Sequence, residues 1–77
     1  MKMTHIITIE KAEITKSKFN HAQIALGFAA GFMGKSGYGI ATDSSTHYEF
    51  WLMDGNKEVA EKLKYFLIGF LNMPYLA

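Results

Sequence analysis

His47 and Glu49 are the residues whose types and spacing are best suited to chemistry in this chain. Being two residues apart on an extended strand, they project from the same face. An imidazole and a carboxylate could act in acid–base catalysis, or bind a metal ion together with His5 or His21. Because no third ligand lies close in sequence, we expect a surface His–Glu pair, no catalytic or metal site, and no cofactor.

A polar segment at residues 43–46 contains an aspartate and two serines, and His47 follows it. These are the residue types of a hydrolase triad, but a triad needs a buried acid behind the histidine and an oxyanion site. Short polar side chains in one segment more often hydrogen-bond nearby backbone. We therefore interpret residues 43–46 as a turn between two strands.

Two glycine motifs surround Lys35. A phosphate-binding loop has the pattern G-x-x-x-x-G-K-[ST] between a strand and a helix. Gly34, Lys35 and Ser36 supply its last three positions, but position 29 is alanine and a predicted helix precedes the segment. Gly31 and Gly34 also match the GxxG spacing of KH domains, in which a helix follows. Since a strand is predicted next, we expect a helix end here and no phosphate site.

The composition limits the classes of function. Hydrophobic residues make up 49% of the 77 residues, and eight lysines oppose seven acidic residues, with no arginine and no cysteine. This length predicts a single domain, residues 1–77. The near-neutral charge argues against a nucleic-acid partner, which needs a concentrated positive field. No apolar run approaches the ~20 residues that span a bilayer. We expect no membrane contact and a cytoplasmic location, in the host cell if the chain is phage-encoded.

Three strands are predicted. Residues 3–10 are β-branched and alternate in polarity, and residues 37–42 and 47–53 flank the turn as a hairpin. If Asp43 opposes Thr46, Ala41 faces Tyr48 and Gly39 faces Phe50, so small residues leave room for a helix. The expected inner side chains are Met3, His5, Ile7 and Ile9 in the first strand and Tyr48, Phe50 and Leu52 in the last. The opposite face of the hairpin then carries Tyr38, Ile40, Thr42, His47, Glu49 and Trp51.

Two helices are predicted, over residues 21–33 and 57–72. Asn20 and Gln23 form a capping-box pattern before the first helix, and Gly34 ends it. The element order is therefore β-α-β-β-α. The simplest architecture is an α+β two-layer sandwich, with a small, mostly antiparallel three-stranded sheet and two helices on one face.

The first helix is apolar almost all round, which predicts burial on more than one side. Gly27 and Gly31 share a face of this helix. Each costs roughly 1 kcal/mol against alanine in a helix interior. We therefore expect another backbone, of a sheet or of a partner helix, to approach these two glycines closely.

Two surfaces are predicted to bind proteins. An aromatic, partly polar sheet face is typical of binding surfaces, because Trp and Tyr dominate interface energetics. Two apolar helices on a small sheet also predict a homodimer with helix contacts. The expected partner-binding residues are Tyr38, Ile40, His47, Glu49 and Trp51, and those for self-association are Tyr65, Ile68 and Tyr75.

A chain this small has little room for a pocket of about 300 Å³ or more. We therefore expect a non-catalytic protein-binding module, in its specific form a phage-type inhibitor that docks on and blocks a larger host or defence complex. The alternative is a small nucleic-acid-binding regulator whose exposed aromatics, Tyr38 or Trp51, stack on bases. Its phosphate contacts would come from Lys11, Lys16, Lys18 and Lys35.

Overall fold

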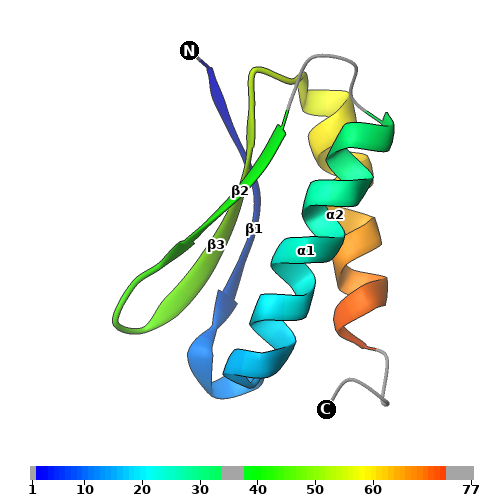
Figure 1. Cartoon of the computed structure of the whole chain (residues 1–77). Helices are drawn as coiled ribbons and strands as arrows, with labels where there is room; N and C mark the ends of the chain where they lie inside the picture. Colours follow the sequence, from blue (N-terminus) through cyan, green and yellow to red (C-terminus); the bar gives the residue numbers. More distant parts are fainter. Residues whose placement is uncertain (1, 34–37, 73–77) are drawn as a thin grey trace.

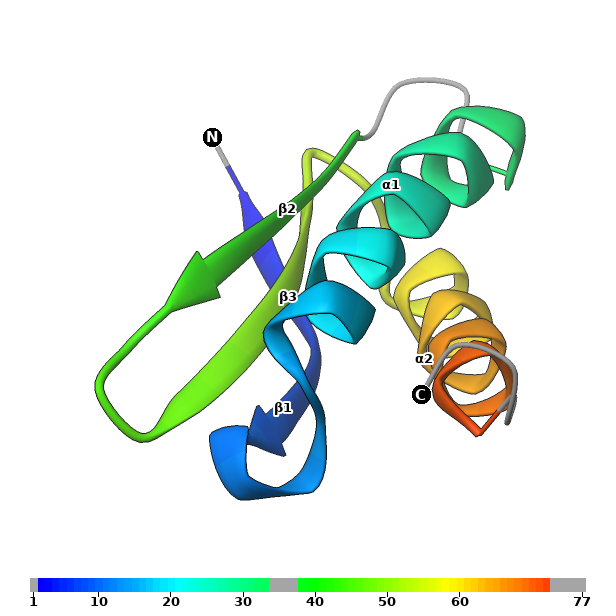
Figure 2. The same ribbon diagram turned by 60° about the horizontal axis from the view of Figure 1, so that its bottom comes forward.

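The chain folds into one sheet with two helices on the same side of it. The computed structural model describes residues 2–33 and 38–72. Its elements are β1 (Met3–Glu10), the short 3-10 helix η1 (Lys11–Glu13), α1 (Lys16–Met33), β2 (Tyr38–Asp43), β3 (His47–Met53) and α2 (Lys57–Leu71). No helix of the described residues covers the other side of the sheet (Figures 1 and 2). The predicted β-α-β-β-α two-layer fold is confirmed.

The spatial order of the strands is β1-β3-β2, which differs from their order in sequence. β3 pairs antiparallel with both neighbours, so β1 and β2 run parallel to each other at the two edges. A parallel relation needs a long crossover connection, and α1 supplies it. α1 packs over β2, α2 packs over β1, and the two helices contact each other.

The core is built on three alternate side chains of the central strand β3. Tyr48, Phe50 and Leu52 are all buried, as predicted. Gly39 of β2, which pairs with Leu52, makes space for α1, since a Cβ at this position would lie 2.5 Å from Leu26 Cγ. The prediction that small residues of this strand let a helix approach is therefore confirmed at Gly39.

The predicted register of the hairpin is wrong by two residues, although the faces are right. Ala41 pairs with Phe50 instead of Tyr48. Ser44 closes a longer turn than expected, because its Oγ accepts from the His47 N–H at 3.2 Å and donates to the His47 carbonyl at 3.0 Å. A shift of two residues returns each side chain to the same side of the sheet, since the side-chain period is two.

The predicted inner face of β1 is wrong in the first half of the strand. Met3 is 50% exposed and His5 is exposed, whereas Ile6 is buried. The register shifts between His5 and Ile7, which is a bulge with Ile6 as the extra residue. Because the bulge exchanges the faces of the strand, only Ile7 and Ile9 beyond it lie inward as predicted.

The first helix begins five residues earlier than predicted. Thr15 caps it: its Oγ1 accepts from the Lys18 N–H at 3.1 Å, and its carbonyl accepts from the Phe19 N–H at 3.0 Å. Asn20 is therefore inside the helix, where its Oδ1 accepts from Gln23 Nε2 at 3.5 Å instead of capping. The early start places Phe19 in the core, stacked on the ring of Tyr48. Gly34, predicted to end the helix, and residue 37 lie outside the described residues.

The second helix forms as predicted, over Lys57–Leu71. Asn56 caps it, with Oδ1 accepting from the Val59 N–H at 2.8 Å. The inner stripe of α2 consists of Ala60, Leu63 and Leu67. Within residues 2–33 and 38–72, neither helix combines the length and apolar character needed to cross a membrane.

Candidate functional site

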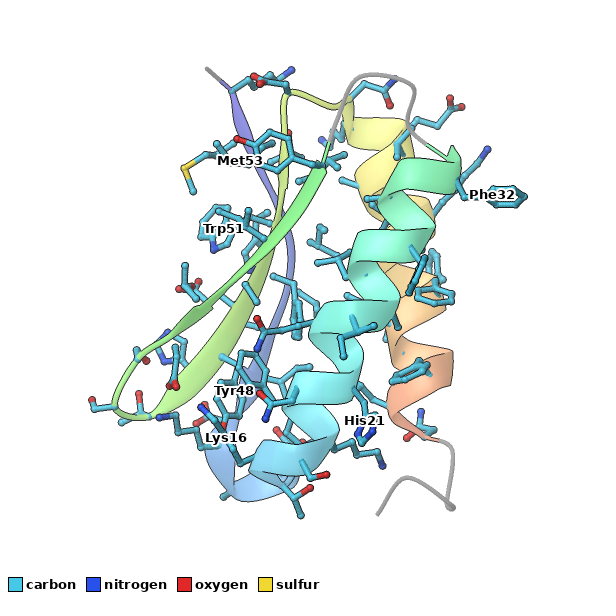
Figure 3. All side chains as sticks on the ribbon, viewed as in Figure 1. Lys16, His21, Phe32, Tyr48, Trp51 and Met53 are labelled. Atoms are coloured by element: carbon cyan, nitrogen blue, oxygen red, sulfur yellow. The ribbon has the colours of Figure 1, made fainter. Side chains whose placement is uncertain are left out.

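Side chains of all three strands meet on the side of the sheet that faces away from the helices, here called the open sheet face. The register places on it Met3, His5 and Thr8 of β1, Tyr38, Ile40 and Thr42 of β2, and His47, Glu49, Trp51 and Met53 of β3. Figure 3 shows Trp51 pointing away from both helices. All five residues predicted to bind a partner therefore share one surface, and their binding role stays a prediction.

One half of the open sheet face is apolar. Met53 is buried between Met3 and Tyr38, its pairing partners on either side, which are 50% and 49% exposed. Trp51 is half-buried, with its ring edge-on to that of His5 at a centroid distance of 5.1 Å. Met3 and Tyr38 thus offer the accessible contact area, and Trp51 and Met53 form the floor between them.

The floor contains an unpaired polar atom. Trp51 Nε1 is shielded from water and has no hydrogen-bond partner among the described residues. A buried donor without an acceptor costs about 1–3 kcal/mol.

The other half of the open sheet face is polar and centres on Glu49. His47 Nε2 lies 3.4 Å from Glu49 Oε1, and His5 Nε2 lies 3.9 Å from Oε2. Thr8 Oγ1 donates to Oε2 at 3.4 Å and lies 2.7 Å from His5 Nε2. The predicted His47–Glu49 pair is confirmed as a pair on one face, and His5 joins it across the sheet.

These residues do not form a metal centre in the described part of the chain. No group of three His, Cys, Asp or Glu side chains within residues 2–33 and 38–72 is arranged to hold a metal ion. His21, the other candidate ligand, lies on α1 with Nδ1 2.9 Å from the Ser17 carbonyl. The His5–Glu49–His47 cluster is, together with Thr8, a polar patch of adjacent imidazole, carboxylate and hydroxyl groups.

The turn interpretation is confirmed for residues 44–46, whereas Asp43 is the last residue of β2 and pairs with Tyr48. Ser44 Oγ hydrogen-bonds the backbone of Thr46 and His47 instead of the His47 ring. Nδ1 of the His47 ring lies 2.9 Å from Thr46 Oγ1. These serine and histidine side chains stabilise the turn and are not arranged as a nucleophile and its base.

Two lysines bind Asp43 at the end of the hairpin. Lys11 Nζ pairs with Oδ1, and Lys16 Nζ lies 3.1 Å from Oδ2. Hydrogen bonds from Lys11 and then Lys16 are the largest causes that lower the pKa of the Asp43 carboxyl below its ordinary value of 3.8. The pair also ties η1 and the start of α1 to β2.

The glycine motifs around Lys35 lie mostly outside the described residues. The structure describes α1 to Met33 and β2 from Tyr38, so Gly34, Lys35 and Ser36 are not placed. The order of elements is helix then strand. A P-loop requires the opposite order.

The second exposed surface is the outer side of α1. Ile24, Phe28 and Phe32 are 61%, 78% and 94% exposed, and Figure 3 shows Phe32 pointing out from the helix. A Cβ added at Gly27 or Gly31 would meet no atom within 4 Å. We call these five residues the outer helix face. The predictions of burial on more than one side and of a close backbone at the glycines are therefore wrong within one chain.

The outer helix face continues into a groove toward α2. The groove has a volume of about 380 Å³, and its lining residues, Ala25, Phe28, Ala29, Phe32 and Phe66, are all apolar. Of the residues predicted for self-association, Tyr65 is 63% exposed and Ile68 is also exposed on α2, whereas Tyr75 lies outside the described residues. Sequence reasoning missed Ile24, Phe28 and Phe32, although a signal was present: a sheet on one side cannot cover a helix that is apolar all round.

A hollow of about 660 Å³ lies between the first half of β1 and α2. Its walls include three lysines, Lys2, Lys57 and Lys64, and one acid, Glu61. The chain therefore has more concave surface than its length predicts. The walls of this hollow contain none of the five predicted partner-binding residues.

Comparisons with models of known protein families, with curated proteins and with solved structures find no match to this chain.

Proposed function

We propose that the chain is a non-catalytic protein-binding module that contacts a larger protein through the open sheet face. In its specific form it is a phage-type inhibitor that blocks a host or defence complex by covering one of its surfaces. The observation that carries the proposal is the half-exposure of Tyr38 and Met3 on a sheet face that no described helix covers.

The arrangement of this face supports binding of a protein surface. Interfaces commonly have an apolar centre with a polar rim, and Tyr and Trp supply a large share of their energy. Here Tyr38 and Met3 stand on either side of buried Met53, and Glu49 with its two histidines lies at the other end. The partner that fits presents an apolar side chain between Tyr38 and Met3, and hydrogen-bond donors toward Glu49.

Two of the four lysines that a nucleic-acid-binding regulator would use are already paired. Lys11 and Lys16 both contact Asp43. Their positive charge is therefore partly neutralised within the chain, which lowers the field available to phosphate. Lys35 lies outside the described residues. The protein-binding proposal is favoured on this ground.

The proposal is tested by affinity capture followed by reconstitution with the purified partner. Tyr38→Ala removes an exposed ring and should weaken binding by about 30-fold or more, as expected for an interface hot spot. Tyr65→Ala is the control, because it removes an exposed tyrosine of α2 that does not belong to the open sheet face; Tyr65 is 63% exposed and Tyr38 is 49% exposed. Equal affinities of the Tyr38→Ala and wild-type chains would overturn the assignment of this face.

The His47–Glu49 pair allows a separate test against an enzyme. A His47→Ala, Glu49→Ala double variant that loses a biochemical activity of the wild-type chain contradicts a non-catalytic module. Thermal unfolding of the double variant separates this outcome from loss of the fold.

A further inference from the structure

The outer helix face is the most exposed apolar surface of the described residues. Phe28 and Phe32 are 78% and 94% exposed, and Ile24 beside them is 61% exposed. Contiguous apolar patches of this kind usually mark interaction sites, because an isolated protein gains by removing them from water.

The shape of the face combines protrusions with a recess. Ile24, Phe28 and Phe32 are spaced by four and form one row along α1, and Gly27 and Gly31 form the neighbouring row. The space above both glycines is empty out to 4 Å from the Cβ position. A row of large side chains beside a row without side chains can fit a second copy of itself.

The charge of the face is also compatible with a second copy. From Phe19 to Phe32 the helix contains no lysine, arginine, aspartate or glutamate. Two such faces meet without repulsion between like charges and without burying a charge. Amphipathic helices that lie on membranes typically carry Lys and Arg on their polar face, which this stretch lacks.

We propose that two copies of the chain associate around a two-fold axis with their α1 helices antiparallel. Phe28 and Phe32 of each copy then lie over the partner's Gly27 and Gly31. In a two-fold interface the same patch serves both subunits, so each copy must carry both the protrusion and the recess. Gly27 and Gly31 destabilise the helix of a single chain, but in the dimer they make room for the partner's phenylalanine rings.

The available area is that of a weak, concentration-dependent dimer. A buried phenylalanine removes about 150–250 Å² from water, so two from each copy supply about 600 Å² or more. Ile24 and the groove walls toward Phe66 add to this area. The total approaches the ~1,000 Å² expected of a specific interface.

The dimer leaves both open sheet faces accessible. The helices and the open sheet face lie on opposite sides of the sheet (Figure 2). A pair joined through α1 would therefore present two target-binding faces on opposite sides.

Sedimentation equilibrium of the purified full chain over a wide range of concentrations tests the proposal. The wild-type chain should change from one to two chains per particle as its concentration rises. Phe28→Glu places a charge in the interface and should weaken dimerisation by about 30-fold or more. Gly31→Leu fills the recess and should weaken it comparably, although it meets open space in a single chain.

Tyr65→Glu adds the same charge to an exposed aromatic residue of α2, within the surface that the sequence predicts for self-association, and should leave dimerisation through α1 unchanged. Far-UV circular dichroism confirms that each variant is folded. A wild-type chain that stays monomeric at every concentration overturns the dimer. Dimerisation that survives Gly31→Leu, or that Tyr65→Glu weakens as strongly as Phe28→Glu, overturns the α1-centred geometry. Because the measurement uses the chain alone, its failure is distinguishable from failure of the Tyr38 test.

Discussion

The open sheet face and the outer helix face are both apolar surfaces, but they expose their side chains to different extents. On the sheet, Trp51 and Met53 are partly or fully covered by their neighbours, and only Met3 and Tyr38 stand out. On the helix, Phe28 and Phe32 are almost entirely exposed and the glycines beside them leave open space. Neighbouring side chains of the same chain cover much of the apolar part of the open sheet face, whereas no side chain of the described residues covers the phenylalanines of the outer helix face in that way.

The difference has a geometric cause. In a sheet, cross-strand neighbours lie about 4.5–5.5 Å apart and shield one another, as His5 and Ile40 do on either side of Trp51. Side chains on the outer side of a helix diverge from its axis, and only a second helix or sheet can cover them. An exposed apolar helix face therefore indicates an interface more strongly than an exposed sheet face does.

The largest contrast compares two phenylalanines. Phe50 is fully buried, so Phe50→Ala should destabilise the fold by about 3–5 kcal/mol. Phe32→Ala should change the stability of dilute, monomeric protein by about 0.5 kcal/mol or less, because the ring is 94% exposed. Urea unfolding of both variants measures the difference. A large loss in Phe32→Ala at low concentration would show that part of the same chain covers this ring.

The next contrast compares the same substitution, glycine to alanine, at Gly39 and at Gly31. Gly39→Ala puts a Cβ 2.5 Å from Leu26 Cγ and should destabilise by about 1–3 kcal/mol. Gly31→Ala meets nothing within 4 Å and should stabilise the helix by about 1 kcal/mol, or roughly 4–8 °C in Tm. Thermal unfolding of dilute protein tests the opposite signs. Destabilisation by Gly31→Ala under these conditions would mean that another backbone already packs on α1 within one chain.

The smallest expected effect concerns pH at the end of the hairpin. Lys11 and Lys16 lower the pKa of the Asp43 carboxyl in the folded state. The ionised carboxylate therefore stabilises the fold at pH values above its ordinary pKa of 3.8. The contribution is lost as pH falls through the lowered pKa. Asp43→Asn should therefore flatten the dependence of Tm on pH below about 4. Glu13→Gln, which removes an exposed acid, is the control, and an equal flattening there would contradict the assignment to Asp43.

Local signals in the sequence predicted the element types well. The hairpin, its two faces and the second helix follow from alternation, turn residues and the Asn56 cap. The start of α1 was missed, because Asn20 and Gln23 form a plausible cap pattern. Thr15, a less favoured capping residue, makes the actual contact. An early start buries Phe19 against Tyr48, and this gain in packing outweighs the local preference.

The bulge in β1 could not be predicted from alternation alone. A regular strand turns only one of Ile6 and Ile7 inward, whereas the bulge, which depends on pairing with β3, turns both toward the core. The same bulge moves His5 to the open sheet face, where it meets Glu49 and Trp51. The cluster of His5, Glu49 and His47 therefore depends on a tertiary feature.

By itself, the sequence determined the β-α-β-β-α order, the two faces of the hairpin and the apolar surplus, because these depend on short-range periodicity and composition. Only the tertiary structure decided that β3 lies between β1 and β2, that Ile6 bulges, and that α1 turns its phenylalanines outward. The reason is that a helix apolar on every side has no periodic signal to orient it. Its inner side is chosen by fit to the sheet, where Leu26 packs over Gly39.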